Sequence, residues 1–385
     1  MRSSTLKTTI HFEGNALSRL AKLEYKKVFI IADPFIVSSG LIKAVTKHLD
    51  SAGIEYKVYS DVVPDPTVEK VVSGVAALSK EMAPCLIAVG GGSAIDLAKC
   101  VRLFTHNIHP DYSPRFIAIP TTSGTGSEVT SFAVITDTSK NVKHAIIDDF
   151  LLPNEAILDV EMVKSVPASV TADTGLDVLA HALEAYVSTE ADYFTDMYAE
   201  KATSLCKHYL VRSYNYPKTH ENKARDKMHV ASCLAGIAFN AASLGICHSI
   251  AHQLGAQFHI PHGRANAIVL PDVIGFNSGI AENTFKLDNP GPCVSKYANM
   301  SRRIGLAGYD DIACVKALAF YIRSMQIEMG MPVCVQDAVP NLTYEEYESK
   351  LDAMAAAALL DRCTGTNPRK PTKEDIIQIL KKVWK

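Results

Sequence analysis

The chain of 385 residues has no long uninterrupted apolar run, and no stretch approaches the roughly 18 apolar residues that a membrane-spanning helix needs. The first residues, MRSSTLKTTIHFEG, contain no apolar core of the length that a signal peptide requires. A basic block is also missing, because 39 Lys and Arg and 41 Asp and Glu are spread along the sequence and leave a net charge of −2. These absences predict a soluble, cytoplasmic protein that binds neither membranes nor nucleic acid.

Cysteines are present, but their pattern argues against disulfide bonds. There are 9 of them, an odd number, at irregular spacings and without a CxxC motif. A chain of this length, with 48% hydrophobic residues, can bury a large core without covalent cross-links. We therefore expect reduced thiols and a globular protein of two domains.

The first part of the chain alternates short apolar, β-branched runs with segments of helical length. The runs are KVFIIAD (27–33), IEYKVYS (54–60), CLIAVGGG (85–92), RFIAIPTT (115–122), FAVIT (132–136) and EAILD (155–159). Runs such as VFII, LIAV and FIAI are typical of a parallel sheet that is covered on both faces. Residues 1–164 are therefore predicted to form an α/β dinucleotide-binding domain.

From Pro167 onward the β-branched runs disappear and a helical periodicity of 3.6 residues takes over. The predicted helices cover residues 170–188, 192–211, 223–240, 243–258, 310–329, 343–360 and 372–384. Residues 165–385 are therefore predicted to form an all-α domain.

Two glycine-containing loops follow predicted strands and indicate phosphate binding. In GGGSAIDLAK (90–99) glycines precede a helix, so the backbone and the helix N-terminus could hold a diphosphate; a tight turn is the simpler alternative. PTTSGTGSE (120–128) offers the hydroxyls of Thr121, Thr122 and Thr125, although it could be an ordinary solvated loop. Both loops lie at carboxyl ends of predicted parallel strands, where open α/β sheets bind ligands.

Asp33 ends the strand KVFIIAD and bears on the choice of cofactor. A carboxylate at such a position can bind the adenosine ribose and repel a 2′-phosphate, which favours NAD over NADP. However, Asp33 precedes the glycine-rich loop in the sequence, the reverse of the usual order. A helix N-cap before Pro34 explains it equally well.

A set of histidines and one carboxylate indicates a metal site in the second half. In GLDVLAHALEAYVS (175–188), Asp177 and His181 are four residues apart and would share one helix face. His248 and His252 are also four residues apart in a helix-compatible run, and His262 is expected in the loop after Pro261. Three imidazoles and a carboxylate suit one Fe²⁺ or Zn²⁺ ion. Ordinary hydrogen-bonded histidines are the alternative, and spacing alone does not choose between Asp173, Asp177 and Glu184 as the carboxylate.

Several motifs together resemble the iron-dependent (group III) alcohol dehydrogenases over the whole chain. They are VPDPT (63–67), GGGSAIDLAK, IPTTSGTGSEVT, AILDVEM, TGLDVLAHALEAYVS, GICHSIAHQLGAQFHIPHGRANA and TNPR (366–369). Within that family the chain is most similar to the short-chain alcohol dehydrogenases of propanediol and ethanolamine utilisation and to sulfoacetaldehyde reductases. The resemblance implies the dehydroquinate-synthase-like fold, with an α/β NAD-binding domain and a helical metal-binding domain.

The resemblance also implies the site residues. The metal ligands would be Asp177, His181, His248 and His262, which selects Asp177 as the carboxylate, and the ion would be Fe²⁺, with Zn²⁺ or Mn²⁺ as alternatives. His252 would lie near the nicotinamide and the substrate and take part in proton transfer. The cofactor contacts would be Asp33, Gly91, Gly92, Ser93, Asp96, Thr121, Thr122, Thr125 and Lys143.

The expected reaction is the NAD(H)-dependent interconversion of a short-chain aldehyde and its primary alcohol, in which a metal polarises the carbonyl. Small side chains around residues 240–247 favour a small substrate. Sulfoacetaldehyde reduction and glycerol or diol oxidation are the alternatives. Arg264 would favour an anionic substrate only if it turned inward; we expect it to face solvent or a neighbouring carboxylate. A homo-oligomer, such as a dimer, is expected, and the resemblance leaves open a place within a bacterial microcompartment.

Overall fold

The computed structural model describes residues 4–139, 142–280, 293–306 and 308–385, with the backbone alone at 142 and 143. Two compact units make up the chain. The first comprises Met1–Val166 and Arg225–Ile237, and the second comprises Pro167–Ala224 and Ala238–Lys385. Helix α8 (Asn222–Ala242) therefore contributes residues to both units.

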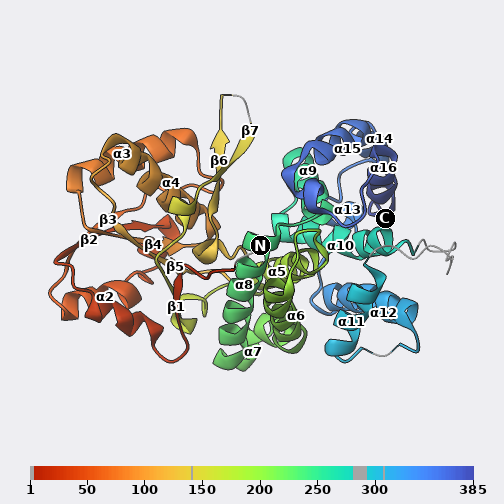
Figure 1. Cartoon of the computed structure of the whole chain (residues 1–385), viewed down its shortest axis with the longest axis horizontal. Coiled ribbons are helices and arrows are strands. Elements are labelled where there is room, and N and C mark those ends of the chain that lie inside the picture. The colour runs from red at the N-terminus through yellow and green to blue at the C-terminus, as the bar shows by residue number, and fades with distance from the viewer. Residues whose placement is uncertain (1–3, 140–141, 281–292, 307) are drawn as a thin grey trace. The chain divides into compact units, whose positions relative to one another are not determined.

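The first unit is built on a parallel sheet with the strand order β1-β8-β5-β4-β2-β3 (Figure 1). Its strands are β1 (Thr9–Phe12), β2 (Lys27–Ala32), β3 (Glu55–Tyr59), β4 (Cys85–Gly90), β5 (Arg115–Pro120) and β8 (Glu155–Leu158). Five of these were predicted from apolar runs, and β4 is buried along its whole length as a central parallel strand requires. The prediction of a parallel α/β domain is confirmed.

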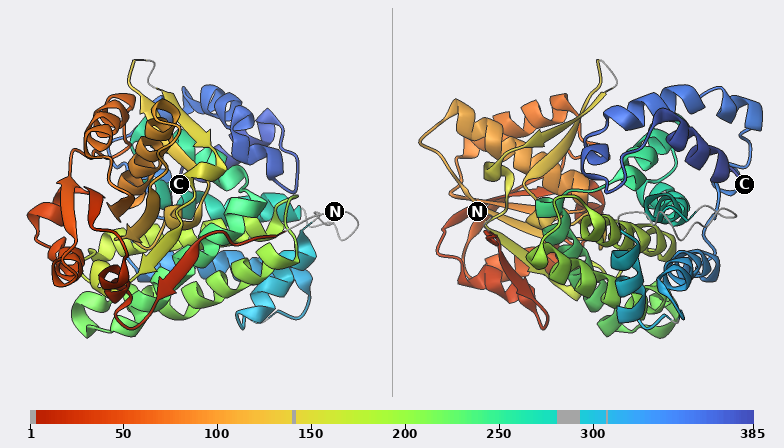
Figure 2. Two further views of the ribbon diagram at one scale, coloured as in Figure 1. Left: turned by 60° about the vertical axis from the view of Figure 1, so that its left-hand side comes forward. Right: turned by 45° about the vertical axis from the view of Figure 1, so that its right-hand side comes forward.

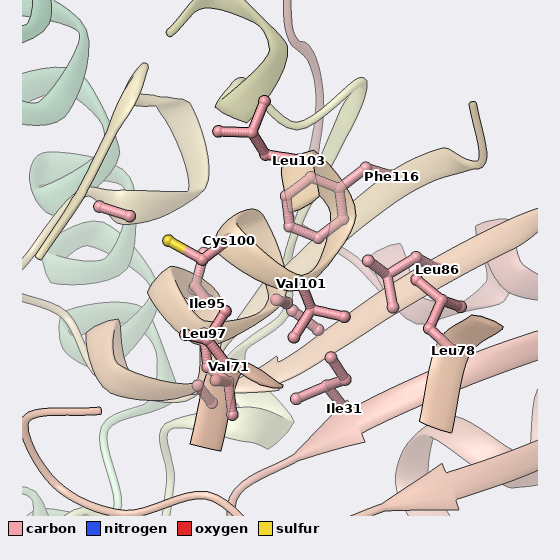
Figure 3. Close-up of a cluster of buried hydrophobic side chains, with 14 of the residues drawn as sticks. Ile31, Val71, Leu78, Leu86, Ile95, Leu97, Cys100, Val101, Leu103 and Phe116 are labelled. Carbon is pink, nitrogen blue, oxygen red and sulfur yellow. The ribbon is translucent and has the colours of Figure 1, made fainter. Parts of the chain in front are cut away.

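Helices cover both faces of this sheet (Figure 2). Besides α8, the helical elements of this unit are η1 (Ala16–Lys22), α1 (Pro34–Ser38), α2 (Lys43–Ser51), α3 (Val68–Glu81), α4 (Gly92–Ile108), η2 (Ser127–Val129), η3 (Asp149–Leu151) and η4 (Val160–Met162). Side chains of α3 and α4 form one apolar core with alternate residues of the strands, which includes Ile31, Leu86 and Phe116 (Figure 3). A second core packs η1 and α2 against the opposite sheet face.

The apolar run FAVIT does form a strand, but outside the parallel sheet. It lies in β6 (Phe132–Asp137), which pairs antiparallel with β7 (Val142–Ile147) as a separate two-stranded sheet. In β6 the buried residues Ala133 and Ile135 alternate with less buried ones. This alternation is typical of a strand with one covered face.

The second unit consists of helices in all its described segments. They are α5 (Ala168–Val187), α6 (Tyr193–Tyr214), α7 (Tyr216–Thr219), α9 (Ile246–Phe258), α10 (His262–Ser278), α11 (Val294–Arg303), α12 (Asp311–Glu328), α13 (Val335–Ala338), α14 (Tyr344–Glu348), α15 (Leu351–Leu360), η5 (Arg362–Thr366) and α16 (Lys373–Lys382). The predicted helix 343–360 is divided into α14 and α15. The all-α prediction is confirmed.

Within the described segments, no single helix has both the length and the apolar composition to cross a membrane. The pair α8 and α9 meets those two criteria jointly, but the pair is bent by 107° at its break.

Candidate metal centre and cofactor loops

Helix α5 carries two of the predicted metal ligands on one buried face. Asp177 and His181 are 4% and 5% exposed and lie one turn apart. The helix is buried along most of its length, as its largely apolar sequence predicts. The ring of Phe239 stacks on His181 with centroids 4.4 Å apart. Asp177 and His181 are therefore fixed on a rigid element rather than on a loop.

The other two predicted ligands lie in the first turns of α9 and α10. His248 is the third residue of α9, whose N-cap is Gly245. His262 is the first residue of α10, so the prediction that it lies in a loop was wrong. Pro261 does end the preceding segment, but it also serves as the N-cap of α10, a position beside the first turn where proline's missing N–H costs nothing.

The four side chains converge. One ligand atom from each of Asp177, His181, His248 and His262 lies within 4.8 Å of the others. Asp177 Oδ1 is 3.7 Å from His248 Nε2 and 3.6 Å from His262 Nε2. Three of the residues are buried, whereas the His262 side chain is 44% exposed and leaves the set accessible from its side.

Two buried nitrogens at the centre of this set lack a hydrogen-bond partner among the described residues. They are Nδ1 of His181 and Nε2 of His248. A buried polar atom without a partner is costly unless a ligand satisfies it. Burial also lowers the pKa of His248 well below its usual range, which keeps the imidazole neutral, the form that binds metals. The set therefore fits a divalent ion.

Asp177 is ionised in this set. Burial opposes its ionisation, but the three imidazoles and the Asn266 amide outweigh burial and hold the pKa of Asp177 below its usual range. Asn266 Nδ2 donates to Asp177 Oδ1 at 2.8 Å and lies 3.1 Å from His262 Nε2. Asn266 was missed by the sequence reasoning, although it follows His262 by one helical turn and so shares its face.

The two other carboxylates that the sequence left open have different partners. Asp173 accepts two hydrogen bonds from Arg264, from Nε at 3.1 Å and from Nη2 at 3.0 Å. The expectation that Arg264 faces a neighbouring carboxylate is confirmed. Glu184 lies 2.6 Å from His248 Nδ1, on the side of the ring away from the other ligand atoms.

His252 lies beside the histidine set and is paired with a carboxylate. Its ring stacks on His262 with centroids 5.3 Å apart, and Nδ1 is 2.8 Å from Asp361 Oδ2. The His252 side chain is 42% exposed. Burial opposes the ionisation of Asp361, but the bond and charge of His252 lower the pKa of Asp361 to about 2.

The predicted cofactor loops meet at the carboxyl ends of β2, β4 and β5 in the first unit. Thr121 N donates to Gly90 O at 3.0 Å, and Asp33 N donates to Val89 O at 3.0 Å. A Cβ on Gly92 would lie 2.9 Å from Thr125 Cγ2, so the two loops touch where only glycine fits. Helix α4 starts at Gly92, and no described side chain caps its N-terminus, which leaves N–H groups for an anion.

Two of the predicted cofactor residues, Asp33 and Asp96, form hydrogen bonds within the first unit, and a third, Lys143, lies on a strand. Asp33 Oδ1 accepts from Phe35 N at 2.8 Å, so Asp33 caps α1. The Asp96 carboxylate accepts from Ser127 Oγ at 2.6 Å and from Val134 N at 3.0 Å, which ties α4 to the threonine-rich loop. Lys143 lies on β7, and its side chain is outside the described part of the structure.

Comparisons with known proteins agree with this fold. Residues 7–160 match the iron-containing alcohol dehydrogenase family, and residues 171–384 match the C-terminal part of the Fe-containing alcohol dehydrogenase family. The chain is 40% identical to the 1-propanol dehydrogenase PduQ of Salmonella typhimurium over the full length of both chains. It is 37% identical to the NADPH-dependent butanol dehydrogenase of Clostridium saccharobutylicum, covering 100% of this chain and 98% of that one.

Solved structures share the whole architecture. A 1,3-propanediol oxidoreductase superposes with a TM-score of 0.88 at 31% identity, with both chains fully covered. Sulfoacetaldehyde reductase from Bifidobacterium kashiwanohense in complex with NAD⁺ superposes with a TM-score of 0.84 at 26% identity, covering 100% of this chain and 98% of that one. The chain therefore belongs to the iron-containing alcohol dehydrogenase family, which uses an iron ion and a nicotinamide dinucleotide to interconvert aldehydes and alcohols.

Proposed function

We propose that this enzyme interconverts a short-chain aldehyde and its primary alcohol, with Fe²⁺ held by Asp177, His181, His248 and His262. The observation that carries the proposal is the convergence of these four side chains with two buried nitrogens that have no partner among the described residues. Zn²⁺ and Mn²⁺ accept similar ligands and are the alternatives to iron. Because the His262 side chain is partly exposed, a small substrate could reach the ion from that side.

The first unit would bind NAD(H) through its two loops. The contacting residues would be Asp33, Gly91, Gly92, Ser93, Asp96, Thr121, Thr122, Thr125 and Lys143. Support comes from the uncapped start of α4 and from the close approach of Gly92 to Thr125, which together offer backbone N–H groups and hydroxyls to a diphosphate. Asp96 would act mainly by bracing the threonine-rich loop, since both of its oxygens already accept hydrogen bonds.

The chemistry requires a hydride, a proton and an electrophilic carbonyl. When bound, the metal supplies Lewis acidity and the nicotinamide supplies the hydride. Asp177 and the three histidines bind and orient the ion, and Asn266 holds the Asp177 carboxylate in place. We propose His252 as the residue that moves the proton required by the alcohol product, because Asp361 fixes Nδ1 and leaves Nε2 for transfer.

A neutral substrate is favoured over an anionic one. Arg264 is the cation nearest in sequence to His262, and both of its hydrogen bonds go to Asp173. A guanidinium already neutralised by a carboxylate offers little to a sulfonate. The similarity to a sulfoacetaldehyde reductase keeps that substrate as the second candidate. A glycerol or diol dehydrogenase activity is a further alternative.

Steady-state kinetics would test the proposal. The iron-loaded enzyme would be assayed with NADH and acetaldehyde, propionaldehyde or sulfoacetaldehyde, and with NAD⁺ and glycerol or 1-propanol. We expect the highest kcat/KM with the neutral aldehydes. A higher kcat/KM with sulfoacetaldehyde would assign the second candidate, and no turnover of any aldehyde by the iron-loaded enzyme would refute the proposal.

We further propose a cytoplasmic homo-oligomer, with a dimer as the simplest form, and leave its association with a microcompartment to experiment. The nine cysteines are all free, as expected in a reducing compartment. Strand β1 lies at the end of the strand order, and an edge strand can pair with a second copy. Light scattering coupled to size-exclusion chromatography would give the number of chains.

A further inference from the structure

The carboxylate of Glu184 lies between α5 and α9, two helices that carry proposed metal ligands. It is 2% exposed and sits on α5, three residues after His181. Its oxygens reach α9, the helix that carries His248. The mechanism described above does not use this residue, although a buried carboxylate normally needs a specific reason to be retained.

Glu184 accepts hydrogen bonds from the start of α9. Cys247 N donates to Oε1 at 2.7 Å, and His248 N lies 3.4 Å from Oε2. The first N–H groups of a helix have no partners within the helix, and no side chain at the N-cap Gly245 supplies one here. Glu184 therefore caps α9 from a different helix.

The same carboxylate also contacts the metal-ligand histidine. Oε2 lies 2.6 Å from His248 Nδ1, whereas Nε2 of that ring faces Asp177 and has no hydrogen-bond partner among the described residues. Oε2 and Nδ1 share one proton across this contact, and when the Glu184 carboxylate is ionised, Nδ1 carries that proton and donates it to Oε2. A proton on Nδ1 leaves the lone pair of Nε2 free for a metal ion.

A second residue completes the support of α9 and gives the TNPR segment a role. Asn367 Oδ1 accepts from Ile246 N at 3.2 Å, and its Nδ2 donates to Asn277 Oδ1 at 2.7 Å and to Arg369 O at 2.6 Å. A Cβ on Gly245 would lie 2.7 Å from both Asn367 Oδ1 and Glu184 Oε1. Only glycine lets these two side chains reach the start of α9.

We infer that Glu184 is a positioning residue for the metal site: it selects the Nδ1–H tautomer of His248 and fixes the ring so that Nε2 points at the ion. Asn367 holds the same helix start but does not contact the imidazole. The inference rests on the proposed set of metal ligands. It makes metal affinity depend on a residue that does not bind the metal.

Glu184→Gln separates this role from packing, because glutamine keeps the volume but has only one acceptor oxygen. If that oxygen accepts from Cys247 N, the amide NH₂ faces Nδ1 and forces the proton to Nε2, where a metal should bind. We expect Co²⁺ affinity, measured by competition with a chelator, to fall about tenfold or more, with an altered visible spectrum of bound Co²⁺. An unchanged affinity and spectrum would overturn the inference.

Ser188→Ala is the matched control. Ser188 is buried at the C-cap of α5, four residues after Glu184, and its hydroxyl donates to Ala242 O rather than to a histidine. We expect this variant to lose some stability and to bind Co²⁺ like the wild type. Failure of the wild-type protein itself to bind Co²⁺ would instead refute the proposed ligand set.

The tautomer can also be measured in the wild-type protein without any variant at Glu184. In metal-free protein labelled with ¹⁵N-histidine, the chemical shifts of the two ring nitrogens report which one is protonated. His248→Gln assigns the signals by their loss. We expect the Nδ1–H form of His248, and observation of the Nε2–H form would overturn the inference even if Glu184→Gln does not fold.

Discussion

Gly263 shows how a single missing side chain sets the distance between two helices that carry proposed metal ligands. A Cβ at this position would lie 2.2 Å from Asp173 O and 3.1 Å from Asp177 Cβ. The first contact is with backbone, which cannot rotate away as a flexible side chain could. The glycine therefore allows α10, which starts with His262, to approach α5.

We predict that Gly263→Ala separates His262 from Asp177. The free energy of unfolding should fall by about 1–3 kcal/mol, as for other overpacked sites, and Co²⁺ binding should weaken strongly. Urea unfolding and chelator competition would measure the two effects. Gly365→Ala is the control, since nothing lies within 4 Å of a Cβ at that position. Normal Co²⁺ binding by Gly263→Ala would contradict the close-approach argument.

For Asp33 the sequence offered two alternative roles, a helix cap and a contact with the cofactor. Its Oδ1 caps α1, so the N-cap interpretation is confirmed, while its proposed contact with the adenosine ribose stays a prediction. We predict that Asp33→Gly lowers the ratio of kcat/KM for NADH over that for NADPH by about tenfold, which corresponds to about 1.4 kcal/mol of lost charge repulsion.

Asp148→Gly is the control for this substitution, because Asp148 caps η3 in the same unit through a similar hydrogen bond to Phe150 N at 2.7 Å. It should reduce stability only slightly, by roughly a few tenths of a kcal/mol as for other N-cap residues replaced by glycine, and leave the cofactor ratio unchanged. An unchanged ratio in Asp33→Gly would reduce the role of Asp33 to that of a cap.

The limits of sequence-based prediction are clearest for the three acidic residues of α5. Asp173, Asp177 and Glu184 all share a helix face with His181, so helical spacing could not rank them. Their roles depend on partners remote in sequence: Arg264 is 91 residues from Asp173, and Cys247 is 63 residues from Glu184. The sequence carries no local signal for such contacts. The family resemblance selected Asp177 where spacing could not.

At the scale of elements, the apolar patterns of buried strands and amphipathic helices predicted those elements whose structure the local sequence determines. The parallel strands β2, β4 and β5 and the helices α5, α6 and α12 lie where their apolar patterns indicate. Helix α10 was not predicted, because Pro261 borders it and Pro271 interrupts its pattern. Strand β7 was also missed, since its sequence VKHAII becomes a strand only through pairing with β6.

Helix α8 holds the threonine-rich loop through a buried histidine. His229 is 1% exposed, and its Nδ1 lies 3.1 Å from Ser123 Oγ. Farther along α8, a Cβ on Gly236 would lie 2.9 Å from Gly126 O, so loop and helix are in close contact. Burial lowers the pKa of His229 to about 4, although the charge of Asp159 acts in the opposite direction.

The depressed pKa of His229 predicts a loss of stability in mild acid. The folded protein keeps His229 neutral, whereas the unfolded chain binds a proton near pH 6.5, so this contribution is complete above that pH and is lost as pH falls towards 4. Between pH 7 and pH 5 the loss amounts to about 2 kcal/mol. Urea unfolding of wild type and His229→Asn across this range would measure it, and parallel pH profiles for both proteins would contradict the prediction.

At the scale of the whole molecule, the two proposed sites belong to different compact units. The four proposed ligands all lie in the second unit, and the two cofactor loops lie in the first. An ion that binds only the folded protein stabilises it by about 4 kcal/mol when its concentration is 1,000 times Kd. This stabilisation should be concentrated in the helices that carry the ligands.

We therefore predict that removal of the metal by a chelator abolishes turnover but leaves the affinity for NADH within about a factor of three. The reason is that the ion stabilises the second unit, which carries its proposed ligands, and not the first unit, which carries the cofactor loops. Hydrogen exchange should accelerate in α5, α9 and α10 and stay unchanged in β4 and β5. NADH fluorescence would report cofactor binding, and re-addition of Fe²⁺ should restore activity and exchange protection together. Loss of NADH binding, or faster exchange in β4 and β5 to the same extent as in α5, would show that the ion also organises the first unit and that the two sites are not independent.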